Sequence, residues 1–236
     1  MSSKKLMIVS GDSFTASVYQ SMHYPEVNTD WTVWPELVAD KLGMTCINLA
    51  KSGFGNEYIY SSLLDNITKR PIEDIGFVCA SWTESKRMDW TIKGYWDSDL
   101  MIQSFLQMRS PGGDAQHQIN RTLRYQYSFQ QVMKSLNLPF AQIQTLGLGR
   151  HDDGIKRNKL PTSLRGYNPN DLCRFKFDKT FIDHTRHYKW GAESEIVPHE
   201  EEYRIGPNDE HFNEKGHKLF ADYIFDSITK KGLLNV

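Results

Sequence analysis

The segment Ile75–Ser81, which reads "IGFVCAS", is the feature that most constrains the fold of this chain. A strand with one face in water alternates apolar and polar residues, and this segment does not alternate. A nearly continuous apolar run of this length is typical of a central strand that is buried on both faces. Such strands occur mainly in parallel sheets that helices cover on either side. The segment therefore predicts an α/β protein.

Apolar runs and helical patterns alternate along the rest of the chain. Further strands are predicted at 5–10, 45–50 and 139–147, and helices at 34–43, 56–68, 119–137 and 213–232. This alternation predicts one domain over residues 1–236, a three-layer α/β/α sandwich with a central, mostly parallel sheet of about five strands. Residues 85–118 and 148–207 lack a clean period, and we interpret them as insertions.

Composition excludes several classes of function. The net charge of −1 does not favour a nucleic-acid or membrane partner, and no apolar run approaches the roughly 18 residues of a membrane span. Because the N-terminus lacks the apolar core of a secretory signal, we expect a cytoplasmic protein, or a virion-associated one if a phage encodes it. Cys46, Cys79 and Cys173 are widely spaced, so we expect buried free thiols. We predict no metal or cofactor, since His184 and His187 could share a cation only on a helix.

Four short motifs stand where predicted strands end or where the last helix begins. Gly11–Phe14 ("GDSF") follows the first strand, "NLAKSGFGN" (48–56) the second and Ser81–Ser85 the third, while "PNDEHFNEKGH" (207–217) precedes the last helix. The carboxyl ends of parallel strands share one edge of the sheet, where α/β proteins place their ligands. We therefore expect these four motifs to meet.

This set of motifs resembles the SGNH (GDSL-type) hydrolase family, which has a flavodoxin-like fold and includes esterases, lipases, thioesterases and carbohydrate deacetylases. The resemblance implies that Ser13 is the nucleophile and His211 its base, with His217 the weaker candidate for the base. It also implies an oxyanion hole that includes the backbone N–H groups of Ser13 and Gly53. We further expect Ser13 to begin a helix whose dipole would assist its N–H.

The chain departs from the family at the third motif. The family reads Gly-x-Asn-Asp, and its asparagine donates a hydrogen bond to the oxyanion, whereas this chain has Ser81-Trp82-Thr83-Glu84. Thr83 takes the place of that asparagine in an ungapped alignment, and its hydroxyl can donate. Ser81 or another side chain could serve instead.

The second departure concerns the acid. The family places an aspartate three residues before the histidine, a position that Asn208 holds here, and Asp209 lies one residue closer. We favour Asp209 as the orienting acid, because a neutral partner cannot stabilise the imidazolium that forms. Asn208, or a Ser–His dyad aided by backbone carbonyls, stays open.

Four further residues are candidates for lining or bracing the site: Asp12, Asn56, Trp82 and Arg87. We interpret Asp12 as a cap of a following helix or a partner of the loop backbone, and we do not count it as catalytic. Glu84 is either a solvated loop acid or the partner of Arg87.

The hypothesis that follows is a serine esterase without cofactor, acting on an O-acetyl or short acyl ester of a small molecule or saccharide. Trp90, Tyr95 and Trp96 could stack on sugar rings. The alternative is a catalytically weak or inactive binding module that keeps the fold, because the third motif is altered. A phosphate-binding flavodoxin-like protein is disfavoured, because the loop after the first strand lacks a glycine-rich run and a lysine.

Overall fold

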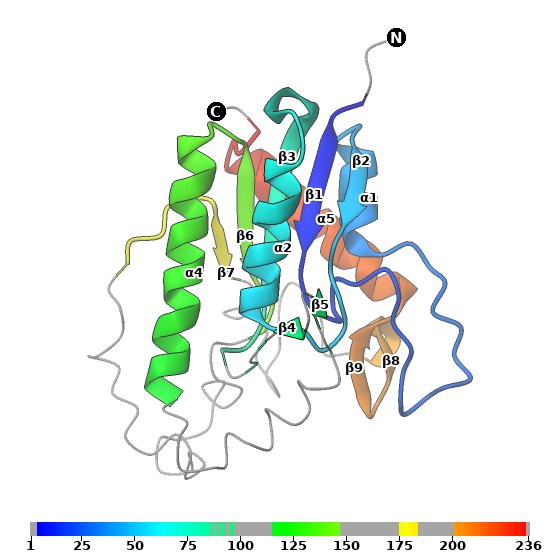
Figure 1. Ribbon diagram of the computed structural model, residues 1–236. Coiled ribbons are helices and arrows are strands. Elements are labelled where there is room, and N and C mark those ends of the chain that lie inside the picture. The colour runs from blue at the N-terminus through cyan, green and yellow to red at the C-terminus, as the bar shows by residue number, and fades with distance from the viewer. Residues whose placement is uncertain are drawn as a thin grey trace.

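The centre of the molecule is a five-stranded parallel sheet with the strand order β2-β1-β3-β6-β7 (Figure 1). The computed structural model describes residues 4–85, 87, 89, 91–92, 95–96, 115–146, 175–183 and 201–234. The strands of the sheet are β1 (Leu6–Ser10), β2 (Thr45–Asn48), β3 (Ile75–Trp82), β6 (Phe140–Gln144) and β7 (Phe181–Asp183).

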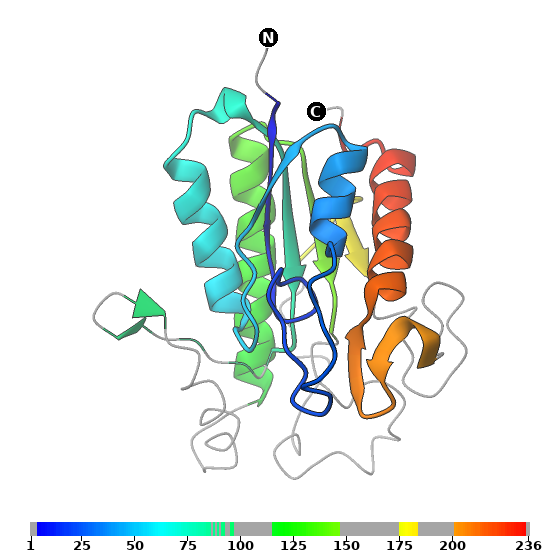
Figure 2. The ribbon, with the colours of Figure 1, turned by 90° about the vertical axis from the view of Figure 1, so that its right-hand side faces the viewer.

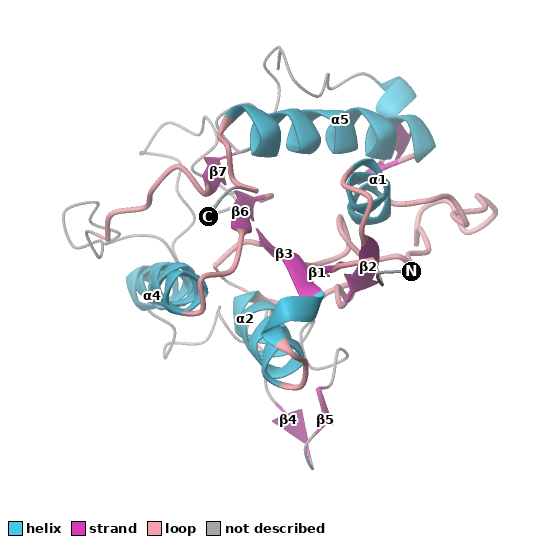
Figure 3. Cartoon of the chain, turned by 90° about the horizontal axis from the view of Figure 1, so that it is seen from above, coloured by secondary structure: helices cyan, strands magenta, loops and turns pink. Residues whose placement is uncertain are grey.

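Four helices cover the two faces of this sheet. Helices α1 (Trp34–Lys41) and α5 (Glu214–Lys230) lie on one face, and α2 (Asn56–Thr68) and α4 (Ala115–Ser135) lie on the other (Figure 3). The predicted three-layer α/β/α sandwich is therefore confirmed, and the sheet lies between two hydrophobic cores.

The apolar run of β3 serves both cores. Phe77 and Cys79 pack toward α1 and α5, whereas Val78 and Ala80 pack toward α2 and α4. Successive side chains of a strand point to opposite faces, so a strand between two helical layers needs apolar residues at every position. All eight residues of β3 are buried, which explains why its sequence is apolar except for Ser81, whose hydroxyl is hydrogen-bonded to Thr15.

Several elements differ from the sequence prediction. The segment predicted as an insertion after residue 147 contributes β7 to the sheet, and α4 begins four residues earlier than predicted. The segment before α5, for which no strand was predicted, is an antiparallel hairpin of β8 (Arg204–Gly206) and β9 (Asp209–Phe212). Smaller elements are the pair β4 (Thr91–Ile92) and β5 (Tyr95–Trp96), and the 3₁₀ turns η1 (Ile72–Asp74) and η6 (Glu201–Tyr203).

The carboxyl ends of the strands all point to one end of the molecule. The loop 11–33 and the β8–β9 hairpin lie at that end, and β1 begins and α5 ends at the opposite one (Figure 2). Cys46 and Cys79 are free thiols on β2 and β3, and Cys173 lies outside the described residues. None of the helices in the described part of the chain is both long and apolar enough to cross a membrane.

Candidate active site

Ser13 lies in a tight turn directly after β1. The backbone N–H groups of Thr15 and Ala16 both donate to the carbonyl of Asp12 at 3.0 Å, and the chain then continues as a loop to α1. The prediction that Ser13 begins a helix was therefore wrong, because the hydrogen bonding stops after one turn. No helix dipole assists the Ser13 N–H, and the turn alone presents the side chain.

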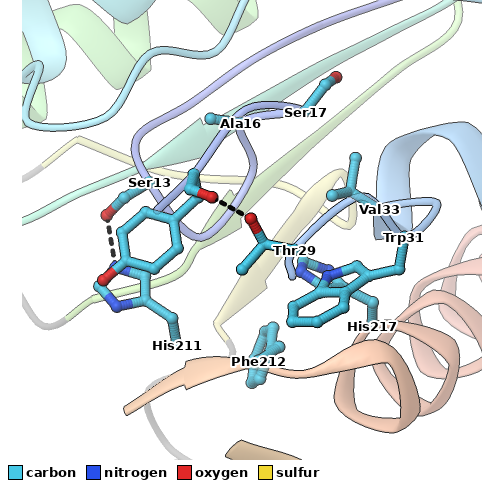
Figure 4. Close-up of a pocket in the computed structure, with 10 residues that line it drawn as sticks. Ser13, Ala16, Ser17, Thr29, Trp31, Val33, His211, Phe212 and His217 are labelled. Atoms are coloured by element: carbon cyan, nitrogen blue, oxygen red, sulfur yellow. Dashed lines mark hydrogen bonds between the residues drawn. The ribbon is translucent and has the colours of Figure 1, made fainter. Parts of the chain in front are cut away.

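The hydroxyl of Ser13 contacts the imidazole of His211. Ser13 Oγ lies 2.7 Å from His211 Nε2, although the two residues are 198 positions apart in the chain. Ser13 comes from the turn after β1 and His211 from strand β9 of the hairpin, and Figure 4 shows the two side chains facing each other. The convergence of the first and last motifs at one edge of the sheet is thus present in the structure.

The second nitrogen of the His211 ring contacts Asp209. Nδ1 lies 2.6 Å from Asp209 Oδ1, and this oxygen also accepts the backbone N–H of His211 at 3.0 Å. Both residues are on β9, where side chains two positions apart share a face. Asn208 instead lies exposed in the turn, where its backbone N–H donates to the Tyr24 hydroxyl. Of the three alternatives for the group that orients His211, Asp209 is the one in contact with the imidazole.

The surroundings of Asp209 favour its ionised form. Burial opposes ionisation, but the pKa of this carboxyl lies well below its usual range because the His211 side chain, Ser21 and the His211 backbone N–H donate to it. The side chain is only 2% exposed. The buried Asp209 carboxylate therefore contacts the imidazole of His211 on the side opposite Ser13.

Tyr19 is a member of this cluster that sequence reasoning missed. Its hydroxyl donates to Asp209 Oδ2 at 2.9 Å, and its ring stacks on His211. It lies in the loop 11–33, where no periodicity or motif marks it. A search for phenols near the first motif would have found both Tyr19 and Tyr24 without distinguishing them.

Two backbone N–H groups in the loops after β1 and β2, those of Ser13 and Gly53, have no hydrogen-bond partner among the described residues. The loop of Gly53 runs beside that of Ser13, because the Lys51 N–H donates to the Gly11 carbonyl at 3.1 Å. Gly53 has a φ of +84°, which side-chain-bearing residues rarely adopt.

The two side chains considered as a third donor are both occupied elsewhere. The Thr83 hydroxyl donates to Asp12 Oδ2 at 2.6 Å, and the Ser81 hydroxyl accepts from Thr15 and contacts Thr145. Both side chains are fully buried. The structure thus does not fit our expectation that Thr83 donates to an oxyanion, since its single proton is directed at a buried carboxylate.

Three of the four residues considered as lining the site are buried inside the protein instead. The Trp82 side chain has no exposed surface and donates to Gln142 in the core between the sheet and α4. Asn56, which is 2% exposed, binds the backbone of Thr83 with both ends of its amide. Asp12 is also without exposed surface. The expectation that these three side chains line the site is therefore corrected, because none of them has more than 2% of its surface exposed, whereas Asn56 and Asp12 brace the loops by binding their backbone.

Arg87 braces the loops around Ser13. Its Nη1 lies 3.2 Å from Asp12 Oδ2 and donates to the Phe54 carbonyl at 3.3 Å, while Nε pairs with Glu84. The interpretation of Glu84 as the partner of Arg87 is therefore confirmed. Asp12 itself accepts the Phe14 N–H, so it bonds the loop backbone and caps no helix.

His217 is not in contact with Ser13. It lies in the first turn of α5, where its Nδ1 accepts the backbone N–H of Trp34 at 3.3 Å. Burial, together with the nearby His211, lowers the pKa of His217 to about 3. This ring is therefore a neutral, buried side chain at neutral pH, and it does not replace His211 as a partner of Ser13.

A small pocket adjoins Ser13 and His211 (Figure 4). Its wall mixes aromatic, aliphatic and hydroxyl side chains from the loop 11–33, among them Ala16, Tyr19, Thr29, Trp31 and Val33. Trp90, His184 and His187 lie outside the described residues, and of Tyr95 and Trp96 only the backbone is described. Among the described residues, no group of three or more His, Cys, Asp or Glu side chains is placed to hold a metal ion.

Comparison with known proteins identifies the fold. No protein-family model matches the sequence, and a search of curated proteins finds no relative. Among solved structures, a lipolytic protein of the G-D-S-L family from Desulfitobacterium hafniense DCB-2 aligns with 11% identity and a TM-score of 0.50, over 94% of this chain and 99% of that one. The lipase Lip_vut3 from a goat rumen metagenome aligns with 11% identity and a TM-score of 0.54, over 97% and 98% of the two chains. The chain thus has the fold of the GDSL-type lipolytic proteins.

Proposed function

We propose that this chain is a serine esterase of the SGNH (GDSL-type) family, with Ser13 as nucleophile, His211 as base and Asp209 as the acid that orients the imidazole. The observation that carries this proposal is the continuous chain of contacts from Ser13 Oγ through the two nitrogens of His211 to Asp209 Oδ1, at 2.7 and 2.6 Å. A serine hydroxyl is a weak nucleophile unless an adjacent base takes its proton, and this arrangement supplies the base.

The proton positions follow from the partners of the imidazole. Asp209 is ionised and can only accept, so His211 carries its proton on Nδ1 and leaves Nε2 free to accept from Ser13. Ser13 Oγ attacks the ester carbonyl while its proton passes to Nε2, and the resulting imidazolium is stabilised by the carboxylate. His211 then protonates the departing alcohol, and an acyl group remains on Ser13. Water, deprotonated by His211, releases the acid and restores the hydroxyl.

The negative oxygen of the tetrahedral intermediate is stabilised by backbone N–H groups. The candidates are those of Ser13 and Gly53, which have no partner within the described residues. With the hydroxyls of Thr83 and Ser81 engaged elsewhere, these two are the only donors we assign. Because losing one donor of an oxyanion hole costs on the order of 10²–10³ in rate, we expect a slower enzyme than one with three donors.

The substrate we propose is an ester of a short acyl group, such as an O-acetyl ester on a small molecule or saccharide. Among the described residues the pocket beside Ser13 is small, which supports an acetyl group over a long acyl chain.

Hydrolysis of p-nitrophenyl acetate by the protein and its Ser13→Ala variant tests the proposal. We expect the variant to lose about 10⁴-fold or more of kcat/KM, as in other serine hydrolases without their nucleophile. Ser135→Ala is the matched control, because Ser135 is an exposed serine at the end of α4, at the opposite end of the sheet. Equal rates for the protein and Ser13→Ala would refute the esterase.

A second candidate function rests on the missing third donor. A chain with this fold and a weak oxyanion hole could serve as a binding module that turns over little or no ester. A fluorophosphonate probe distinguishes the two, because it labels Ser13 only if the hydroxyl is activated. Labelling that Ser13→Ala abolishes supports the esterase, and absent labelling supports the binding module.

A further inference from the structure

Tyr19 is attached to the Asp209 carboxylate by its hydroxyl. The two oxygens of this carboxylate have different partners: Oδ1 lies 2.6 Å from His211 Nδ1, and Oδ2 accepts the Tyr19 hydroxyl at 2.9 Å. A carboxylate that is held at both oxygens cannot rotate about its bond to the chain without losing one partner. The phenol therefore fixes the plane of the acid that contacts His211.

The ring of Tyr19 restrains the imidazole as well. It stacks on His211 with 4.0 Å between ring centroids and an angle of 27° between planes, and Phe14 stacks on the opposite face at 4.4 Å and 24°. With an aromatic ring on each face, the imidazole cannot turn out of its plane. In this orientation Nε2 faces Ser13 and Nδ1 faces Asp209.

Tyr19 is itself held in place by its own loop. The Thr29 hydroxyl donates to the Tyr19 carbonyl and so joins two parts of the loop 11–33. The side chain is half-buried, and burial together with Asp209 raises the pKa of its phenol. The phenol therefore keeps its proton at neutral pH and remains a donor to the carboxylate.

We propose that Tyr19 is a positioning residue of the esterase site, which holds Asp209 by its hydroxyl and His211 by its ring so that Nε2 stays directed at Ser13. This inference rests on the proposed function, and it adds a residue that neither the GDSL-type motifs nor the contacts of Ser13 identify. No hydrogen bond joins Tyr19 to Ser13 in the described part of the chain, although both residues line the small pocket. Its effect on the reaction passes through the two residues that it holds.

Two variants separate the two actions of the side chain. Tyr19→Phe keeps the stacked ring and removes the hydroxyl, whereas Tyr19→Leu removes both. The matched control is Tyr24→Phe. Tyr24 lies in the same loop and its hydroxyl contacts the same hairpin, but it accepts the backbone N–H of Asn208 and does not touch the carboxylate.

Steady-state hydrolysis of p-nitrophenyl acetate gives the first readout. We expect Tyr19→Phe to lower kcat about tenfold with KM unchanged, by analogy with removing the partner behind a metal-bound histidine. Tyr19→Leu should lower kcat about 100-fold, because a base displaced by about an ångström loses its alignment with the nucleophile. Tyr24→Phe should keep the kcat and KM of the unaltered protein.

The proton on His211 Nδ1 gives a second readout that needs no turnover. In a short hydrogen bond to a carboxylate this proton resonates far downfield in the ¹H NMR spectrum, and His211→Gln assigns it by abolishing the signal. We expect the signal to shift in Tyr19→Phe and to broaden or vanish in Tyr19→Leu, and to stay in place in Tyr24→Phe.

The outcomes keep the two proposals apart. A Tyr19→Phe variant with unaltered kcat and an unshifted Nδ1 signal overturns the role of Tyr19, even if Ser13 is confirmed as the nucleophile. A protein that neither hydrolyses esters nor reacts with a fluorophosphonate overturns the proposed function, and the NMR signal then decides the role of Tyr19 by itself. If Tyr19→Leu fails to fold, the near-isosteric Tyr19→Phe still decides the question.

Discussion

Replacing Arg87 by methionine should destabilise the fold strongly, because it leaves two buried carboxylates without their cation. The guanidinium lies 3.2 Å from Asp12 Oδ2 and 3.3 Å from Glu84 Oε1, and it donates to the Phe54 carbonyl. The exposed fraction of the side chain is 15% for Arg87, 0% for Asp12 and 4% for Glu84. Methionine keeps much of the length and apolar stem of arginine, so the variant removes mainly the charge and its hydrogen bonds.

Breaking a buried ion pair by removing one partner costs about 3–5 kcal/mol, because the remaining charge is left unpaired. Asp12 retains donors in the Thr83 hydroxyl and the Phe14 N–H, so we expect the lower end of that range, about 3 kcal/mol of the free energy of unfolding. Lys218→Met is the matched control. Its ion pair with Glu214 on α5 is 61% and 58% exposed and should contribute no more than about 0.5 kcal/mol.

Urea unfolding at neutral pH, followed by tryptophan fluorescence, measures both values. A double-mutant cycle with Asp12→Asn isolates the pair, and we expect a coupling energy of about 2 kcal/mol, since residues that share an ion-pair network are not additive. Asp12 precedes Ser13 and Phe54 follows Gly53, so kcat should fall in Arg87→Met as well. A loss below about 1 kcal/mol, or effects that add within about 0.5 kcal/mol, would contradict the assigned role of Arg87.

Three further predictions concern the acid and the glycine. Asp209→Asn should lower kcat for p-nitrophenyl acetate about 10⁴-fold. Asn208→Ala, at an exposed position, should leave kcat unchanged. Similar losses of kcat in both variants would refute the assignment of Asp209 as the acid. Gly53→Ala and Gly43→Ala both place a side chain at a residue with positive φ and open space around it. Each variant should therefore lose about 1–2 kcal/mol of the free energy of unfolding, but only Gly53→Ala should lower kcat. The folded-state pKa of Asp209 is depressed, so its stabilisation is complete above the ordinary carboxyl pKa of about 4 and is lost as pH falls below that value. The free energy of unfolding, measured from neutral to acidic pH, should therefore be higher for the protein than for Asp209→Asn at neutral pH, and this difference should shrink as the pH falls. A difference in the free energy of unfolding that does not change with pH would contradict the lowered pKa of Asp209.

The architecture could be predicted from the sequence because its strongest signals are local. The apolar run of β3 and the helical spacing of α2 each reflect burial against a neighbouring layer, and both elements lie where the pattern predicts them, within a residue. Strand β7 has only three residues, which is too few for a period to be recognised. The β8–β9 hairpin is hidden because "RIGPNDEHF" carries the Gly, Pro, Asn and Asp that are typical of a loop.

Residues of the candidate site could be predicted from the sequence only where they belong to a recognisable motif. Ser13 and His211 could be paired because their motifs resemble those of the SGNH family, and the structure brings the two side chains into contact. The hydroxyl of Thr83 could not be assigned, because its acceptor Asp12 lies 71 positions away in the chain. Tyr19 could not be found for the same reason, since its partner Asp209 is 190 positions distant. Contacts of this kind depend on how distant loops pack together, and no pattern of neighbouring residues in the sequence predicts them.

Asn213 and Gly216, two residues of the motif around His211, join the β8–β9 hairpin to α5. Asn213 begins α5 by accepting the Gly216 N–H, and its side-chain amide donates to the carbonyls of Glu202 and Arg204 at 2.7 and 2.8 Å. One asparagine thereby starts the helix and ties the hairpin to it. A side chain at Gly216 would meet the Tyr203 carbonyl at 2.3 Å, so only glycine allows this contact.

These contacts also account for the unusual place of the acid. They fix the register of β9 where it enters α5, and a slip of one residue would turn every side chain of the strand to the opposite face. In the fixed register, 209 and 211 share a face and 208 does not. An orienting acid three residues before the histidine requires a turn at that point, whereas on a strand the acid must stand two residues before it. The hairpin is therefore the physical reason why the carboxylate lies at Asp209.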